Sequence, residues 1–307
     1  MTGPADNYQA LFARRWGHLR APHVRALAWL IDAPDLLDAA DPAWAGRIAT
    51  LGAASSEVAS WLARVDADPS ALDATLGDKP YTRLGLYAEK LMAFYFHEHG
   101  RLVAHSLQVR ATRNDTIGEF DFLLDAGPHG LEHIEFATKF YLLEGTAATR
   151  FDNLVGPNLL DSLGAKMRKI VDKQLALSAH PAAQALLPRP VVQAHALVKG
   201  WLFYPQTGMA PMAGIQTAHC RGFWCALDDV AQLAADAFVV LPRLEWLAPW
   251  RGAQPLLDRS QLQLALADMP GPVLVAAVRS DGDQLLEFER GFIVPNDWRA
   301  RAGARTA

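Results

Sequence analysis

Residues 102–143, LVAHSLQVRATRNDTIGEFDFLLDAGPHGLEHIEFATKFYLL, decide the fold, because apolar and polar side chains alternate along most of this stretch. Alternation with a period of two is the pattern of a half-buried β-strand. It predicts three strands, at residues 102–111, 117–124 and 131–143. The sequence Asp-Ala-Gly-Pro-His-Gly at residues 125–130 favours a turn that joins the second and third strands as an antiparallel hairpin.

Helical periods flank these strands on both sides. Apolar residues spaced three and four apart predict one helix over residues 83–97 and another over residues 158–178. A bounded apolar run at residues 191–204 predicts a further strand. This order of elements predicts an α/β fold in which helices flank a mixed central sheet.

The same patterns divide the chain into three regions. Residues 1–79 predict a helical N-terminal region, residues 80–204 contain the core, and residues 205–307 predict an α/β extension packed on that core. The strands expected in the extension lie at residues 238–241, 273–278 and 285–294. Residues 299–307 show no apolar pattern, so we expect the tail to fray.

Composition narrows the class of protein. The chain of 307 residues is 51% apolar and 20% charged, which excludes a disordered chain and is enough for a sizeable core. Because the chain has 29 Lys and Arg against 33 Asp and Glu, its net charge of −4 excludes a uniformly basic coat but not a local basic patch.

Two cysteines, Cys220 and Cys225, build no disulfide framework, and we expect buried, inert thiols in a reducing compartment. The start has no signal-peptide pattern and no apolar stretch approaches about 20 residues, so we expect a cytoplasmic protein without a membrane partner.

Carboxylates stand on the second and third predicted strands. Strand alternation places Glu119 and Asp121 on one face of the second strand, and Glu135 and Lys139 on one face of the third. A turn centred near residues 127–128 pairs Asp121 with Glu135, and paired side chains lie about 5 Å apart at Cβ. Two carboxylates at that distance repel each other unless a proton or a cation intervenes. A hard divalent cation with oxygen ligands, Mg²⁺ or Mn²⁺, would resolve this repulsion. Carboxylates exposed to water on a polar sheet face are the alternative interpretation.

The order of these residues resembles the PD-(D/E)XK nuclease superfamily. Glu89, in Leu-Tyr-Ala-Glu-Lys-Leu, matches the glutamate of the helix before the sheet, and Asp121, in Gly-Glu-Phe-Asp, matches the metal-binding aspartate. Glu135 and Lys139, in Ile-Glu-Phe-Ala-Thr-Lys-Phe-Tyr, match the carboxylate and lysine of the next strand. The resemblance implies a restriction-endonuclease-like core that hydrolyses phosphodiester bonds of nucleic acid, with Asp121 and Glu135 as ligands of Mg²⁺ or Mn²⁺ and with Lys139 and Glu89 as catalytic residues. The whole chain also resembles an uncharacterised bacterial family, DUF1853, through its Gly-Glu-x-Asp and Glu-x-x-x-Lys-Phe-Tyr stretches.

The chain departs from the superfamily pattern in one spacing. The superfamily places carboxylate and lysine two residues apart, whereas Glu135 and Lys139 are four apart, which separates their Cα atoms by about 13 Å instead of about 7 Å. A bulge between them would shorten the gap. Alternatively, Ala137 occupies the usual carboxylate position and Glu135 has moved along the same face, or the site has decayed and binds without cutting.

A basic helix face follows the strands. Lys166, Lys169 and Lys173 share one side of the predicted helix over residues 158–178, and Gln174 adds a polar donor. Such a cluster contacts nucleic-acid phosphates or simply faces water. Three functional hypotheses result. The first is a metal-dependent nuclease that uses Asp121, Glu135 and Lys139, and the second is a catalytically inactive module on the same fold that binds nucleic acid or a protein. The third is a structural or interaction protein that uses the tryptophan-rich C-terminal part as its contact surface.

Overall fold

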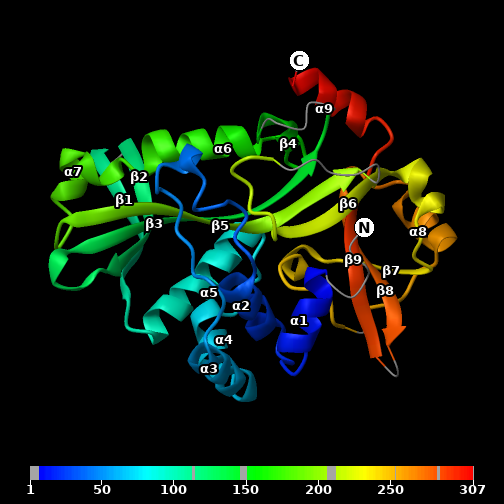
Figure 1. The fold of residues 1–307 in the computed structure, drawn as a ribbon, viewed down its shortest axis with the longest axis horizontal. Coiled ribbons are helices and arrows are strands. Elements are labelled where there is room, and N and C mark those ends of the chain that lie inside the picture. Colours follow the sequence, from blue (N-terminus) through cyan, green and yellow to red (C-terminus); the bar gives the residue numbers. More distant parts are fainter. Residues whose placement is uncertain are drawn as a thin grey trace.

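A nine-stranded mixed sheet forms the centre of the protein, with the strand order β1-β2-β3-β5-β6-β9-β8-β7 and with β4 paired to β3 outside this path (Figure 1). The computed structural model describes residues 7–112, 115–145, 151–205, 212–252, 254–281 and 284–306. The strands are β1 Leu102–Thr112, β2 Asp115–Asp125, β3 Leu131–Leu143, β4 Leu154–Val155, β5 Val191–Pro205, β6 Cys220–Ala226, β7 Ala237–Val240, β8 Val273–Asp281 and β9 Gln284–Val294. The predicted α/β class with a mixed central sheet is confirmed.

The mode of strand pairing changes twice across the sheet. β1, β2 and β3 pair antiparallel, β3, β5, β6 and β9 run parallel, and β9, β8 and β7 are again antiparallel. The C-terminal strands therefore extend the sheet that contains the predicted core. Sequence periodicity missed β6, whose residues Cys220–Ala226 form a short strand between two neighbours.

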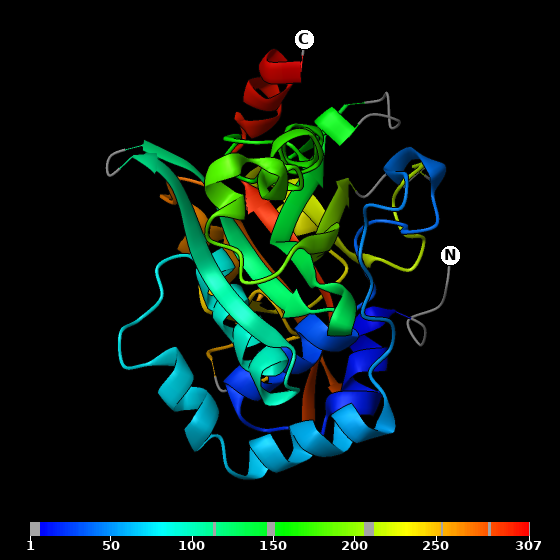
Figure 2. The same cartoon turned by 90° about the vertical axis from the view of Figure 1, so that its left-hand side faces the viewer.

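Helices cover both faces of the sheet (Figures 1 and 2). Five helices lie on one face of the sheet: α1 Tyr8–Trp16, α2 Pro22–Asp32, α3 Ser56–Ala67, α4 Ser70–Leu76 and α5 Leu84–Glu98. On the opposite face lie α6 Leu163–Lys169 and α7 Pro181–Gln184, while α8 Arg259–Leu266 and α9 Trp298–Thr306 belong to the C-terminal region. Within the described ranges, no helix is long and apolar enough to cross a membrane.

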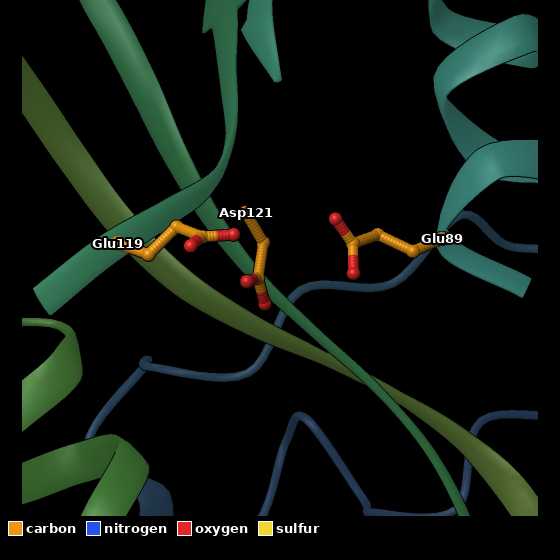
Figure 3. A group of neighbouring side chains, drawn as sticks. All are labelled: Glu89, Glu119 and Asp121. Carbon is orange, nitrogen blue, oxygen red and sulfur yellow. The ribbon is translucent and has the colours of Figure 1, made fainter. Parts of the chain in front are cut away.

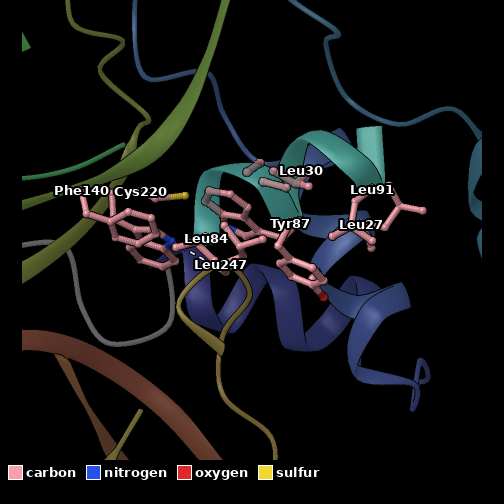
Figure 4. Packing of buried hydrophobic residues seen from close by; sticks show 14 of the residues in the cluster. Leu27, Leu30, Leu84, Tyr87, Leu91, Phe140, Cys220 and Leu247 are labelled. Carbon is pink, nitrogen blue, oxygen red and sulfur yellow. Dashed lines mark hydrogen bonds between the residues drawn. The ribbon is translucent and has the colours of Figure 1, made fainter. Parts of the chain in front are cut away.

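One hydrophobic core joins the N-terminal helices to the sheet. Leu27 of α2 and Leu91 of α5 belong to the same buried cluster as Phe140 of β3 and Cys220 of β6 (Figure 4). Burial raises the pKa of the Cys220 thiol to about 12, so this thiol is protonated at neutral pH. Burial of this apolar surface places α5 directly over β3, and this arrangement positions the site described below.

Two predicted segments differ from the structure. The expected helix over residues 158–178 begins only at Leu163 and widens into a π-turn at Ile170–Gln174, where the Leu175 N–H donates to the Ile170 carbonyl at 2.9 Å. The tail expected to fray forms α9, because Trp298 (1% exposed) packs on Trp224 at a ring distance of 5.0 Å. A single aromatic anchor gives no periodic signal in the sequence, so that prediction was wrong.

Candidate functional site

A cleft of about 590 Å³ opens where the sheet is interrupted between β2 and β3. Over the described residues, the β2–β3 ladder runs from Asp125↔Leu131 to Phe122↔Ile134, and β4 joins β3 again at Leu142. Residues 136–141 of β3, six in succession, line the cleft. Successive residues of a strand point to opposite faces, so a cleft lined by all six opens onto the edge of the strand.

The interruption coincides with a kink at Asp121. Phe120 and Leu123 belong to one buried cluster, whereas Phe122 belongs to the cluster beneath α5, so the alternation along β2 breaks between Phe120 and Phe122. Opposite Asp121 in the β1–β2 register stands Ser106, which has a left-handed backbone conformation (φ 50°). The unbroken alternation predicted for the strand at residues 117–124 is therefore wrong, because local backbone irregularity overrides the period of two. Asp121 accepts the Phe136 N–H at 2.9 Å and so bonds to the edge of β3 with its side chain.

Three carboxylates converge at this kink. Oxygen atoms of Glu89 from α5 and of Glu119 and Asp121 from β2 all lie within 4.8 Å of one another, and the three side chains point toward a common centre (Figure 3). Glu89 is fixed by hydrogen bonds to its Oε1 from His105 Nε2 and Ser106 Oγ, both at 2.8 Å. Glu119 was not among the predicted site residues, although its place two residues before Asp121 was the signal for it.

Glu135 lies near this cluster but not in it. Continuing the observed β2–β3 register by one residue places Glu135 opposite Asp121, in agreement with the predicted pairing. Its side chain is only 1% exposed and is bonded to His133 Nε2 at 3.0 Å and to Gln174 Nε2. The structure thus brings Asp121 together with Glu89 and Glu119, while both oxygens of Glu135 already have partners.

The cluster perturbs the titration of its carboxylates. Burial, together with repulsion from Glu135 and Glu89, raises the pKa of Asp121 to about 8, despite the Phe136 N–H and the nearby Lys166. Burial also acts to raise the pKa of Glu89, but hydrogen bonds from His105 and Ser106 outweigh it and hold that pKa below its usual value. At neutral pH the site therefore requires a proton on Asp121 or a cation beside it.

Lysines approach the cleft from two elements. Lys139 of β3 donates to Asp161 Oδ2 at 3.0 Å, and the Tyr141 hydroxyl donates to the same oxygen at 3.0 Å. Lys166 of α6 is half-buried in the cleft and donates to Gln174 Oε1 at 3.3 Å. Burial and the charge of Lys139 lower the pKa of Lys166, against the opposing effect of the carboxylates.

The predicted basic face is divided by the π-turn. A wider turn rotates Gln174 back above Lys166, although the two residues are eight apart. Lys166 and Gln174 therefore line the cleft, whereas Lys169 and Lys173 are exposed outside its lining. The periodicity of a regular helix cannot reveal this division.

The fold and the site define an α/β protein with a carboxylate and lysine cleft at the open edge of its central sheet. The chain belongs to the family described as a domain of unknown function (DUF1853), whose model matches residues 25–294. The matched range runs from within α2 to the end of β9 and includes all the side chains of the cleft and the carboxylate cluster described above. No curated protein and no solved structure matches the chain.

Proposed function

We propose that this protein is a metal-dependent nuclease with a PD-(D/E)XK-like core, which hydrolyses phosphodiester bonds of nucleic acid in the cleft beside β3. The observation that carries the proposal is the convergence of Glu89, Glu119 and Asp121 within 4.8 Å. The raised pKa of Asp121 supports the proposal. Repulsion between the neighbouring carboxylates keeps a proton on Asp121, and a bound cation would relieve the same repulsion. Perturbed carboxylates in a cleft are a recurrent feature of functional sites.

The donor set fits a hard divalent cation. Glu89, Glu119 and Asp121 offer only oxygen atoms, which Mg²⁺ and Mn²⁺ prefer. When bound, such a cation supplies Lewis acidity toward a phosphodiester oxygen and lowers the pKa of water. Asp121 keeps its predicted role as a metal ligand, and Glu119 and Glu89 take the place predicted for Glu135. Glu135 is already bonded to His133 and Gln174.

The lysines supply positive charge for the phosphate. Lys166 lies in the cleft with Asp121 and Glu135 as electrostatic neighbours, so its ammonium group can stabilise charge that develops on phosphate oxygens. Lys139 reaches the same cleft and would exchange Asp161 for a phosphate oxygen. Glu135 acts as a positioning residue, because it holds Gln174, which in turn accepts from Lys166.

Calorimetric titration of Mn²⁺ and Mg²⁺ tests the proposal, followed by cleavage assays on labelled nucleic acid. We expect saturable binding that is lost in Asp121→Asn and Glu119→Gln. The control is Glu98→Gln, which changes an exposed glutamate at the end of the same helix as Glu89. Unchanged cation binding in the two variants of the carboxylate cluster would contradict the proposed ligand set, and absence of cation-dependent cleavage would contradict the nuclease.

A catalytically inactive module that binds nucleic acid or a protein is the second candidate. The ion pair between Lys139 and Asp161 at 3.0 Å favours this candidate, because it holds the lysine away from the carboxylate cluster of Glu89, Glu119 and Asp121. Salt-dependent binding of nucleic acid without cleavage would single out this candidate. For either function we infer a cytoplasmic location, since Cys220 and Cys225 are free, buried thiols.

A further inference from the structure

An aromatic and cationic pair occupies the rim of the cleft. Trp246 and Arg243, from the segment after β7, both line it, and the Arg243 guanidinium carbon lies 5.4 Å from the centre of the Trp246 ring. Trp246 is half-buried and its ring packs edge-on against Phe140 at 5.5 Å, whereas Arg243 is exposed. A ring face and a guanidinium plane are the two surfaces on which proteins stack unpaired bases.

Hydrogen bonds hold Trp246 in place. Arg290, which is 0% exposed, donates to the carbonyls of Trp246 and Ala248 and forms an ion pair with Glu287 at 2.7 Å. Glu287 in turn accepts the Trp250 N–H at 2.6 Å. The indole N–H of Trp246 is itself bonded to the Leu241 carbonyl at 3.1 Å, so the ring orientation is fixed. A preorganised stacking surface loses little entropy on binding.

Two exposed leucines add apolar surface to a rim that also carries the polar residues Arg83 and Asn158. Leu86 and Leu160 line it with 44% and 83% of their surface exposed. A volume of about 590 Å³ is within the range of pockets that take one small molecule, which is about the size of a single nucleotide.

We infer that the cleft takes an unpaired segment of nucleic acid, with a base stacked on Trp246 and Arg243 and with the adjoining phosphodiester on Lys166. This inference rests on the proposed function and names its substrate class. Trp246, Leu86 and Leu160 suit a base, whereas Lys166 and the carboxylates suit the phosphate and its cation. A base-paired segment has its bases stacked within the helix and presents none of them to Trp246.

Fluorescence anisotropy without added metal tests this inference. The probe is a labelled oligonucleotide, supplied as a single strand and as a blunt duplex of the same sequence. We expect the single strand to bind more tightly than the duplex. Trp246→Ala should weaken the single strand about 5- to 150-fold, the range of one base-stacking interaction, and Arg243→Ala, at an exposed position, should weaken it in the same direction. The control is Trp61→Ala, which removes a half-buried tryptophan that packs on Phe94 away from the cleft.

The outcomes separate this inference from the proposed function. Selective binding of the single strand that depends on Trp246 and Arg243 supports the stacking site, even where no cleavage follows. Cation-dependent cleavage with equal affinity for strand and duplex, or with unchanged affinity in the Arg243 variant, overturns the stacking site and leaves the nuclease standing. Failure of the wild type to bind either probe overturns the inference.

Discussion

Substitution of Asp121 by Asn should make the protein more stable, and increasingly so as pH rises. The folded state raises the pKa of Asp121 from 3.8 to about 8 through burial and through repulsion from Glu135 and Glu89. Between these two values the folded protein binds a proton on Asp121 that the unfolded chain has released. The stability of the wild type therefore falls as pH rises through this window. Asn is neutral at every pH and can still accept the Phe136 N–H through Oδ1.

The size of the effect follows from the proton count. Because the folded state holds one proton more than the unfolded chain, the free energy of unfolding falls by about 1.4 kcal/mol for each unit that the pH rises. Between pH 5 and pH 7 a full proton would give about 3 kcal/mol, and partial exposure of Asp121 to water reduces this to about 2 kcal/mol. Below about pH 4 Asp121 is neutral in the folded and the unfolded state alike, so the two proteins should differ least there and increasingly at higher pH.

Urea unfolding of both proteins at several pH values in EDTA measures this difference. The matched control is Asp125→Asn, at the other end of β2, where a hydrogen bond from Arg189 lowers the pKa of the carboxyl. That group stabilises the folded state above its unfolded pKa, so its removal should destabilise the protein at neutral pH, the opposite sign. A difference between wild type and Asp121→Asn that stays constant from pH 5 to pH 8 would refute the reasoning.

Three further predictions concern packing and charge. Arg290→Met should lower the unfolding free energy by about 3 to 5 kcal/mol because it leaves Glu287 buried and unpaired; the double variant with Glu287→Gln should regain part of this in urea titrations. Lys166→Met should reduce cleavage about 100-fold while Lys169→Met, on the exposed side, leaves it within a few-fold, as single-turnover assays would show. Gly130→Ala should lower the melting temperature, since φ is 140° and the added Cβ would lie 2.4 Å from a backbone oxygen.

Sequence periodicity correctly predicted two elements that form the site, α5 and β3. The helix predicted over residues 83–97 is α5, Leu84–Glu98, and the strand predicted over residues 131–143 is β3. The hairpin register is also as predicted, because the turn at residues 125–130 fixes which residues of β2 and β3 face each other. These features depend on residues close in sequence, and local patterns report them well.

The remaining features depend on contacts that no local pattern contains. The kink at Asp121 requires the left-handed Ser106 on β1 and the Phe136 N–H on β3, and it brings Glu119 toward Glu89. Trp246 reaches the cleft because Arg290 of β9 holds its carbonyl. Residues so far apart meet only when the sheet has formed, so spacing could not show that Glu89 joins Glu119 and Asp121 or that Trp246 reaches the cleft.

The unusual spacing of Glu135 and Lys139 now has a structural counterpart. Both lie on one face of β3, but Glu135 is buried against Gln174, whereas Lys139 extends to Asp161. Lys166 of α6 interacts electrostatically with Glu135, Asp121 and Lys139. Under the proposed function, this helix supplies the lysine ammonium group that the strand supplies in the superfamily. If this is so, Lys166→Met should reduce cleavage more than Lys139→Met. The reverse ranking would return the role to Lys139 and require its ammonium group to leave Asp161 when substrate binds.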